Sequence, residues 1–360
     1  MKATDIKNQL DYKWEKRPNT VWINAKDEIF DIFGLYNPRN ETPFRRMPQG
    51  TATATNEGVA GLNLNTAGGR LTFATDSCYI AIYAKMSAMC RMPHMPRSGS
   101  SGFDLYIRDE KQNQKYACSF IPDSSAKTEY TCTGDSRTDN GKMREYVLNF
   151  PLYDRVDELY IGVSSSAEIQ KSSNPYINEK PVIFYGSSIT QGACVSRPGL
   201  CYENYISRKL HIDYTNLGFS GSARAEDAIV DYMAKLPMSV FVSDYDHNAP
   251  DEEYLEKTHH KMYEKIRDKN PDVPYIMITK PDFDSHPVID AKRREVIKRS
   301  YKKALENGDK NVYFIDGETL FGNEFRDSCL VDGIHPNDIG HMKMGVVIGD
   351  VIEKALKNRK

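Results

Sequence analysis

The sequence lacks a surplus of charge of either sign and lacks a long apolar run. Its 360 residues carry 48 basic and 50 acidic side chains, which gives a formal net charge of −2. Proteins that bind nucleic acid or anionic lipid by electrostatic attraction carry a basic surplus, so we expect no nucleic-acid partner. No window approaches the roughly 18 continuous apolar residues that span a bilayer, so we expect no membrane partner.

A secretory signal is also missing from the start of this sequence. Met1 to Asp5 lack the apolar stretch of such a signal. We therefore expect a cytoplasmic protein. A chain already trimmed of its signal would look identical, and it would be periplasmic or secreted.

Paired cysteine motifs are absent. The seven cysteines are odd in number and scattered, and no two of them form a C-x-x-C pair. This pattern argues against a disulfide framework and against a structural zinc site. We interpret the cysteines as reduced core thiols and expect no metal and no cofactor.

Residues 1–170 have the pattern of an all-β domain. Short runs of alternating, β-branched or aromatic residues recur between turn signals. The expected strands are residues 70–74, 78–86, 103–108, 115–121, 128–133, 144–150 and 158–163. They predict a β-sandwich or jelly roll. We expect the first sixty residues to pack with it, and Ser164 to Lys180 is typical of a linker.

Residues 171–360 alternate between short apolar runs and helical patterns. The expected strands are residues 182–185, 214–217, 240–243, 275–279 and 312–315, and the expected helices are residues 201–210, 225–235, 251–269, 291–307 and 337–356. Short apolar runs are typical of parallel strands buried on both faces. The fold class is therefore α/β, with a flavodoxin-like three-layer α/β/α domain. Its ligand site is expected at the carboxyl ends of the strands.

The first loop at that edge reads Tyr-Gly-Ser-Ser-Ile-Thr-Gln-Gly, from Tyr185 to Gly192, and offers a candidate nucleophile. Ser188 is expected near the amino end of a helix, where backbone N–H groups favour developing negative charge. On its own, the loop is better explained as a serine-capped turn. It is not a Walker loop, because Ala193 stands where Lys is required, and Thr190 breaks the α/β-hydrolase elbow motif.

The next two loops at the same edge offer hydrogen-bond donors. Gly221 ends the run Asn-Leu-Gly-Phe-Ser-Gly, whose backbone can approach a ligand closely, and Asn248 offers a side-chain amide. Taken singly, each loop is explained by a turn without function. The spacing from Asp244 to Asn248 resembles a calcium loop, but Ala249 and Leu255 replace the glycine and glutamate that such a loop requires.

Asp332 and His335 lie three residues apart in the run Asp-Gly-Ile-His-Pro-Asn before the last expected helix. This spacing can place the carboxylate against one imidazole nitrogen and leave the other facing the cleft, which is how a general base is oriented. We expect the other histidines singled out to be structural: His211, His259, His260, His286 and His341. Together the four loops contain a nucleophile, a base, a base orienter and oxyanion donors, the parts of acyl transfer.

These four blocks, in this order across roughly residues 181–357, resemble those of the SGNH (GDSL-like) hydrolases. The resemblance implies Ser188 as the nucleophile, Asp332 and His335 as its triad partners, and the N–H groups of Ser188 and Gly221 with the Asn248 amide as oxyanion donors. Many members have Gly-Asp-Ser where this chain has Gly186-Ser187-Ser188, so Ser187 is the next candidate nucleophile.

A second motif, Gly-Phe-Asp-Leu-Tyr from Gly102 to Tyr106, is similar to the G-x-D-L-Y signature of the β-sandwich in one branch of that family. Relatives in the branch often have a serine block much like this one, followed by a Ser-Arg-Pro-Gly run as in Ser196 to Gly199. We interpret Asp104 as a turn residue rather than a catalytic one.

The resemblance implies a serine esterase that removes small acyl groups, with acetyl on a carbohydrate first among them. Its substrate is a small-molecule or oligosaccharide ester. Phe219, beside the second loop, is a weak sign of a small acyl site. The alternatives are a lysophospholipase or thioesterase with the same residues, and a non-catalytic carbohydrate-binding protein with a relict hydrolase domain. The sequence allows a homo-oligomer without requiring one.

Overall fold

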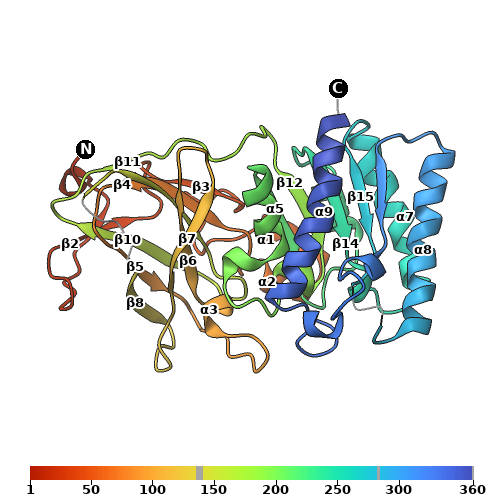
Figure 1. Ribbon diagram of the computed structural model, residues 1–360, viewed down its shortest axis with the longest axis horizontal. Coiled ribbons are helices and arrows are strands. Elements are labelled where there is room, and N and C mark those ends of the chain that lie inside the picture. The colour runs from red at the N-terminus through yellow and green to blue at the C-terminus, as the bar shows by residue number, and fades with distance from the viewer. Residues whose placement is uncertain (135–140, 282–283, 359–360) are drawn as a thin grey trace. The chain divides into compact units, whose positions relative to one another are not determined.

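The computed structural model describes residues 1–134, 141–281 and 284–358, and the chain divides into two compact units (Figure 1). The first unit comprises Met1–Arg46, Leu64–Pro175 and Ser196–Gly199, and the second comprises Met47–Asn63, Tyr176–Val195 and Leu200–Lys360. The long segment of the first unit ends inside the expected linker. The division differs from a single boundary after residue 170. Residues 47–63 belong to the second unit, although they precede that boundary, and residues 196–199 belong to the first unit, although they follow it.

The expectation that all of the first sixty residues pack with the sandwich is wrong from residue 47 onward. This stretch forms two short helices, α1 (Gln49–Thr55) and α2 (Glu57–Leu62). Met47, Ala52 and Val59 are fully buried in the core of the second unit. The aromatic residues behind the expectation all lie before residue 47, whereas residues 48–62 contain none.

The first unit contains two antiparallel sheets, and the sandwich prediction is confirmed. One sheet has the order β1 (Gln9–Leu10), β2 (Thr20–Asn24), β10 (Glu158–Ser164), β5 (Ile80–Lys85) and β8 (Glu129–Gly134). The other has the order β11 (Ile169–Gln170), β4 (Arg70–Thr75), β9 (Arg144–Asn149), β6 (Phe103–Arg108) and β7 (Gln114–Phe120), with β3 (Asp31–Phe33) also paired to β4. A short helix, α3 (Arg97–Ser100), precedes β6. Alternate side chains of both sheets share one core, among them Ile23, Ile82, Ile161, Leu71, Leu105 and Leu148.

The second unit contains a five-stranded parallel sheet, as predicted. Its order is β13 (Tyr214–Gly218), β12 (Val182–Gly186), β14 (Val240–Asp244), β15 (Tyr275–Ile278) and β16 (Val312–Ile315). The helices are α4 (Ser188–Gln191), α5 (Tyr202–Leu210), α6 (Asp227–Met233), α7 (Glu252–Lys269), α8 (Pro287–Glu306) and α9 (Asp338–Asn358). Among the described residues, none of the helices combines the length and the apolar character needed to cross a bilayer.

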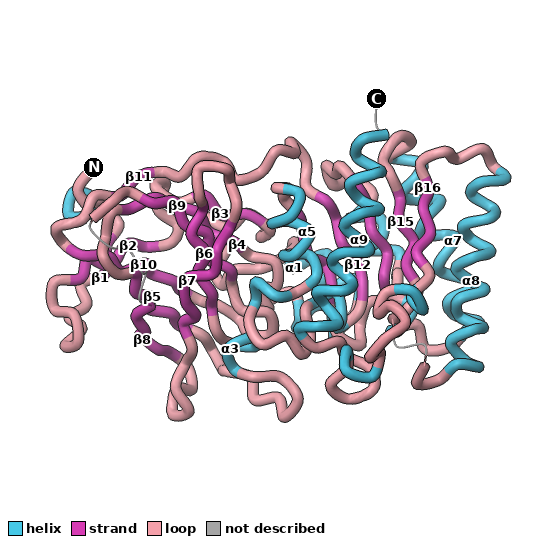
Figure 2. Tube along the Cα trace, in the orientation of Figure 1, coloured by secondary structure: helices cyan, strands magenta, loops and turns pink. Residues whose placement is uncertain are grey.

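Alternation along each strand produces the three layers of this unit. Ile183 and Tyr185 of β12 lie in one core with residues of α6, α7 and α8, whereas Val182 and Phe184 lie in a second core with residues of α5 and α9. Figure 2 shows these strands in magenta with cyan helices on both faces. Because all five strands run parallel, their carboxyl ends lie at one edge of the sheet, where ligand sites of such folds form.

Asp104 lies inside strand β6, so its interpretation as a turn residue was wrong. Its carboxylate is fully buried and accepts hydrogen bonds from Arg197 Nη1 at 2.8 Å, the Gly199 N–H at 2.9 Å and Asn149 Nδ2 at 2.8 Å. The Arg197 guanidinium also stacks 4.0 Å from the centre of the Tyr116 ring. The Asp of the G-x-D-L-Y signature and the Arg and Gly of the Ser-Arg-Pro-Gly run are therefore direct partners within the first unit.

His259 and His341 are core residues of the second unit. Burial is the main reason that the pKa of His259 falls to about 3 and that of His341 to about 4. His341 hydrogen-bonds through Nε2 to the Ala193 carbonyl at 3.0 Å and accepts the Tyr202 N–H at Nδ1. His259 stacks on the ring of Tyr245, and among the described residues neither of its ring nitrogens has a hydrogen-bond partner.

Replacing Asp104 by Ala is expected to lower the free energy of unfolding by about 3 kcal/mol, because removing one partner leaves the other charge half-buried and unpaired. The change is measured by urea or thermal unfolding, with the exposed Glu110→Ala in the next turn as the matched control. An Asp104→Ala protein as stable as the control would contradict a structural role for the pair.

Replacing His259 by Phe is expected to make the protein less sensitive to acid. Because the folded-state pKa lies below the ordinary 6.5, the unfolded state binds more protons, and stability is lost as the pH falls from 6.5 toward 3. In this range the free energy of unfolding falls by up to about 1.4 kcal/mol per pH unit. Relative to wild type, the variant should gain about 2 kcal/mol in unfolding free energy between pH 7 and pH 5. Parallel pH profiles for the two proteins would refute this account.

Candidate active site

Ser188 is the first residue of α4, directly after strand β12. The chain turns tightly here, because a Cβ on Gly186 would lie 2.1 Å from Thr190 Oγ1 and 2.3 Å from the Asp244 carbonyl oxygen. Ser187 is the N-cap, and its fully buried hydroxyl accepts the Ile189 N–H at 3.2 Å. The two serines therefore differ in position: Ser187 caps the helix, and Ser188 retains a small exposed surface.

The structure brings Ser188, His335 and Asp332 together in one hydrogen-bonded path. Ser188 Oγ lies 2.9 Å from His335 Nε2, and His335 Nδ1 lies 2.8 Å from Asp332 Oδ2. With Nδ1 donating to the carboxylate, Nε2 is the nitrogen that can accept the serine proton. This is the geometry of a nucleophile, its base and the group that orients the base.

The loop that carries Asp332 and His335 is built locally. Asp332 Oδ1 accepts the backbone N–H groups of Ile334 at 3.1 Å and His335 at 2.8 Å, while Oδ2 accepts the imidazole. Gly333 has a φ of +82°, which lets the chain turn between the two side chains. Partial burial is the largest single influence on Asp332 and opposes ionisation, but the combined hydrogen bonds prevail and lower its pKa to about 2. The carboxylate is therefore ionised at neutral pH.

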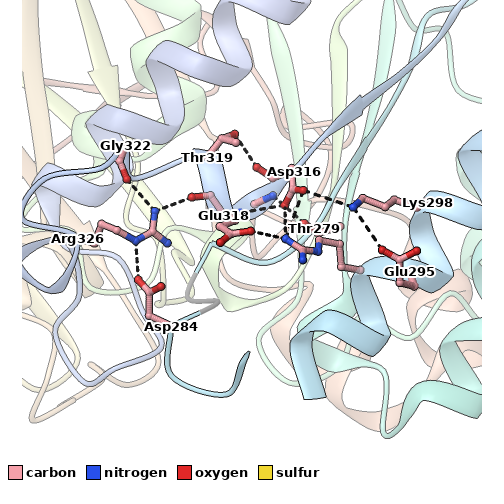
Figure 3. Close-up of polar contacts among 11 residues, drawn as sticks. Thr279, Asp284, Glu295, Lys298, Asp316, Glu318, Thr319, Gly322 and Arg326 are labelled. Carbon is pink, nitrogen blue, oxygen red and sulfur yellow. Dashed lines mark hydrogen bonds and ion pairs between the residues drawn. The ribbon is translucent and has the colours of Figure 1, made fainter. Parts of the chain in front are cut away.

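The chain that leads from β16 to this loop is cross-linked by polar contacts (Figure 3). Arg326 donates to Asp284 Oδ2 at 2.6 Å and to the Glu318 and Gly322 carbonyls at 2.5 and 2.8 Å. Lys298 of α8 lies between Glu295 at 3.3 Å and Asp316 at 3.8 Å. These contacts link the segment that leads to Asp332 and His335 with Asp284 and with helix α8.

Gly221 and Asn248 lie on the neighbouring loops. Gly221 has a φ of +67° and is exposed, and no acceptor for its N–H is found among the described residues. The Ser220 N–H donates to Gln191 Oε1 at 3.0 Å, which ties this loop to α4. Asn248 Oδ1 accepts the Ala223 N–H at 3.2 Å, so the acceptor end of the amide is held and its NH₂ end is the one left to donate.

Phe219 does not wall an acyl site, so that part of the sequence interpretation was wrong. Its side chain has no exposed surface and packs in the core of the second unit with Leu217 and Ala223. Strand β13 ends at Gly218, and the side chain of the next residue, Phe219, lies in the core instead of at the surface.

Sequence reasoning missed a buried polar residue beneath the site, Asn216 of β13. Its Nδ2 donates to the Thr190 carbonyl at 2.5 Å and to Glu203 Oε1 at 3.2 Å, and its Oδ1 accepts the Gly218 N–H at 2.9 Å. It therefore links helix α4, which begins at Ser188, to the strand that leads to Gly221. The available signal was a polar side chain in a strand expected to be buried on both faces.

Comparisons with known proteins identify both units. The GDSL-like Lipase/Acylhydrolase family matches residues 179–353, and the GxDLY family, the N-terminus of SGNH-hydrolase-type esterases, matches residues 20–169. A search of curated proteins gave no significant match.

Several solved structures have the same architecture. A GDSL-like lipase of Bacteroides ovatus is 28% identical with a TM-score of 0.84, covering 94% of this chain and 98% of that one. A salicylyl-acyltransferase from a tetracycline biosynthetic pathway is 18% identical with a TM-score of 0.72, covering 91% and 95%. A family two carbohydrate esterase of Clostridium thermocellum is 15% identical with a TM-score of 0.61, covering 81% and 94%.

The two family matches cover the two halves of the chain in the expected order, and the four blocks lie together at one edge of the parallel sheet. Residues 179–353 therefore form a hydrolase domain of the SGNH (GDSL-like) family, and it follows a GxDLY-type β-sandwich domain formed by residues 20–169.

Proposed function

We propose that the protein is a serine esterase that removes a small acyl group, acetyl first among them, from a carbohydrate. The observation that carries the proposal is the hydrogen-bonded path from Ser188 through His335 to Asp332, with distances of 2.9 and 2.8 Å. A serine hydroxyl is a weak nucleophile until an adjacent base accepts its proton, and this path supplies an oriented base.

In the first half of the reaction, His335 Nε2 accepts the proton of Ser188 as Oγ attacks the ester carbonyl. The carbonyl oxygen becomes negatively charged and accepts hydrogen bonds from the Gly221 and Ser188 N–H groups and from the Asn248 amide. His335 then passes the proton to the leaving alcohol, and the acyl group stays on Ser188.

In the second half, His335 accepts a proton from water, which attacks the acyl-enzyme. The intermediate collapses, the proton returns to Ser188 Oγ, and the acid is released. Asp332 stays ionised throughout and stabilises the imidazolium form of His335. Besides the ester and one water molecule, these steps use side chains and backbone groups of the chain.

The carbohydrate substrate is supported by the fold relatives and by the resemblance to carbohydrate esterases. The family two carbohydrate esterase of Clostridium thermocellum was solved with cellohexaose. A longer acyl group is the second candidate, favoured by the likeness to the GDSL-like lipase of Bacteroides ovatus. The dependence of rate on acyl chain length separates the two.

Wild type is expected to hydrolyse p-nitrophenyl acetate faster than the butyrate and octanoate esters, and Ser188→Ala should lower turnover on the acetate by 10³-fold or more. Ser187→Ala is the matched control. It should retain most activity and lose about 1 kcal/mol of stability with the helix cap.

Rates that rise toward octanoate would favour the lipase-like candidate over the acetylesterase. Full activity in a folded Ser188→Ala protein would refute Ser188 as the nucleophile. Loss of activity in Ser187→Ala alone would transfer that role to Ser187.

Asn248→Ala should lower kcat on p-nitrophenyl acetate by about 10² to 10³ with little change in KM, because an oxyanion donor acts mainly in the transition state. The exposed Asn323→Ala serves as the control, and steady-state kinetics measure both. A change confined to KM would show that the Asn248 amide binds the ground state instead.

A further inference from the structure

We infer that Arg293 of α8 is a positioning residue for the Asn248 amide. Through this contact, helix α8 influences how strongly the amide stabilises the negative charge of the transition state. The inference rests on the proposed function, in which Asn248 is an oxyanion donor. Arg293 itself does not contact the reacting atoms; it acts on the backbone of the loop that carries Asn248.

The contacts of Arg293 enclose that loop. Its Nη1 donates to the Asp246 carbonyl at 2.6 Å, and its Nη2 donates to the Ala249 carbonyl at 3.0 Å and the Pro250 carbonyl at 3.4 Å. The three acceptors lie before and after Asn248. One guanidinium thus fixes both ends of the turn whose middle residue presents the amide.

The other contacts of Asn248 leave this turn dependent on outside support. The turn is a short 3-10 helix, Asp246–Asn248, with an Asn248 N–H to Tyr245 carbonyl bond of 2.9 Å. The side-chain oxygen is held by the Ala223 N–H at 3.2 Å. That bond fixes the direction of the amide only if the backbone of residue 248 stays in place, and the carbonyls that follow it are held by Arg293.

The buried carboxylate of Asp246 favours a basic side chain at this place. Asp246 is fully buried, and its Oδ2 accepts the Lys280 N–H at 3.0 Å. Lys280 Nζ lies 2.9 Å from Asp290 Oδ1. Asp290 lies one helical turn before Arg293. The first turns of α8 thus place one acidic and one basic side chain against the ends of β14 and β15.

Only arginine can make this set of contacts. Its planar fork donates from two nitrogens at once, whereas the single ammonium of lysine cannot reach carbonyls on both sides of the turn in the same geometry. Lysine at this position would keep the charge beside Asp246 and lose the bridge. The substitution therefore separates a positioning role from an electrostatic one.

The test is the kinetics of Arg293→Met and Arg293→Lys on p-nitrophenyl acetate, with Arg299→Met as the matched control. Arg299 lies on the same helix and pairs with Glu256 at the surface. Arg293→Met is expected to lower kcat about 10-fold with KM within twofold, Arg293→Lys to be similarly impaired, and the control to match wild type. Wild-type kcat in both Arg293 variants would overturn the inference, and normal kcat in Arg293→Lys alone would assign the effect to charge.

A double-mutant cycle gives a readout that loss of stability would not reproduce. In an Asn248→Ala background, Arg293→Met should cost no further activity, because the group that it positions is already gone. An equal loss in both backgrounds would show that Arg293 acts elsewhere and would overturn the inference.

Hydrogen exchange followed by mass spectrometry keeps the inference testable if the proposed function fails. If wild type hydrolyses no ester, the amides of residues 246–250 should still exchange faster in Arg293→Met than in wild type and Arg299→Met. Unchanged exchange of these amides would overturn the inference that Arg293 holds the turn, whatever the activity of the protein. The Arg293→Lys protein replaces the methionine variant if the latter does not fold.

Discussion

The imidazole of His335 must hold two hydrogen bonds at once, one to Asp332 and one to Ser188, and the second unit fixes both partners. The Asp332 bond is set within a few residues by the turn at Gly333. The Ser188 bond joins groups 147 residues apart in the chain. It depends on the parallel sheet, because only the shared carboxyl edge brings β12 and the loop before α9 together. The hydrogen bond between Ser188 and His335 therefore depends on the packing of helices on both faces of that sheet.

The loop of Asp332 and His335 and the loops of Gly221 and Asn248 are held in different ways. Asp332 and His335 form a compact loop that supplies most of its own hydrogen bonds. Gly221 and Asn248 lie on loops that depend on distant groups: Gln191 for one, Ala223 and Arg293 for the other. A buried Asn216 connects the strand before Gly221 to helix α4. The donors that we propose to stabilise charge in the transition state are thus positioned by several elements, and such preorganisation makes oxyanion donors effective.

Much of this arrangement could be predicted from sequence because its causes are local. The Asp-Gly-Ile-His run contains the partners of its own turn, and the order of apolar strands and helical patterns defines which loops share an edge. The structure distinguishes the two serines, because Ser187 caps helix α4 and Ser188 does not. The sequence suggested a serine cap at this turn but did not show which serine forms it. The catalytic roles themselves remain predictions that the kinetics will test.

The features that sequence did not predict depend on partners far apart in the chain. Asp104 and Arg197 are separated by 93 residues, and nothing in the neighbourhood of either shows that it has a buried partner. Arg293 lies in a Lys-Arg-Arg run that is typical of a solvated helix face. Residues 47–63 lack aromatic side chains, and their small residues gave no sign of helices that join the second core. Tertiary packing decided each of these.

The most direct test of the central claim is to treat the protein with a serine-reactive phosphonate and to locate the adduct by peptide mass spectrometry. We expect one adduct, on Ser188, and much slower labelling in His335→Ala, because the base activates the hydroxyl. An adduct on another residue, or no adduct on the folded protein, would contradict Ser188 as the activated nucleophile.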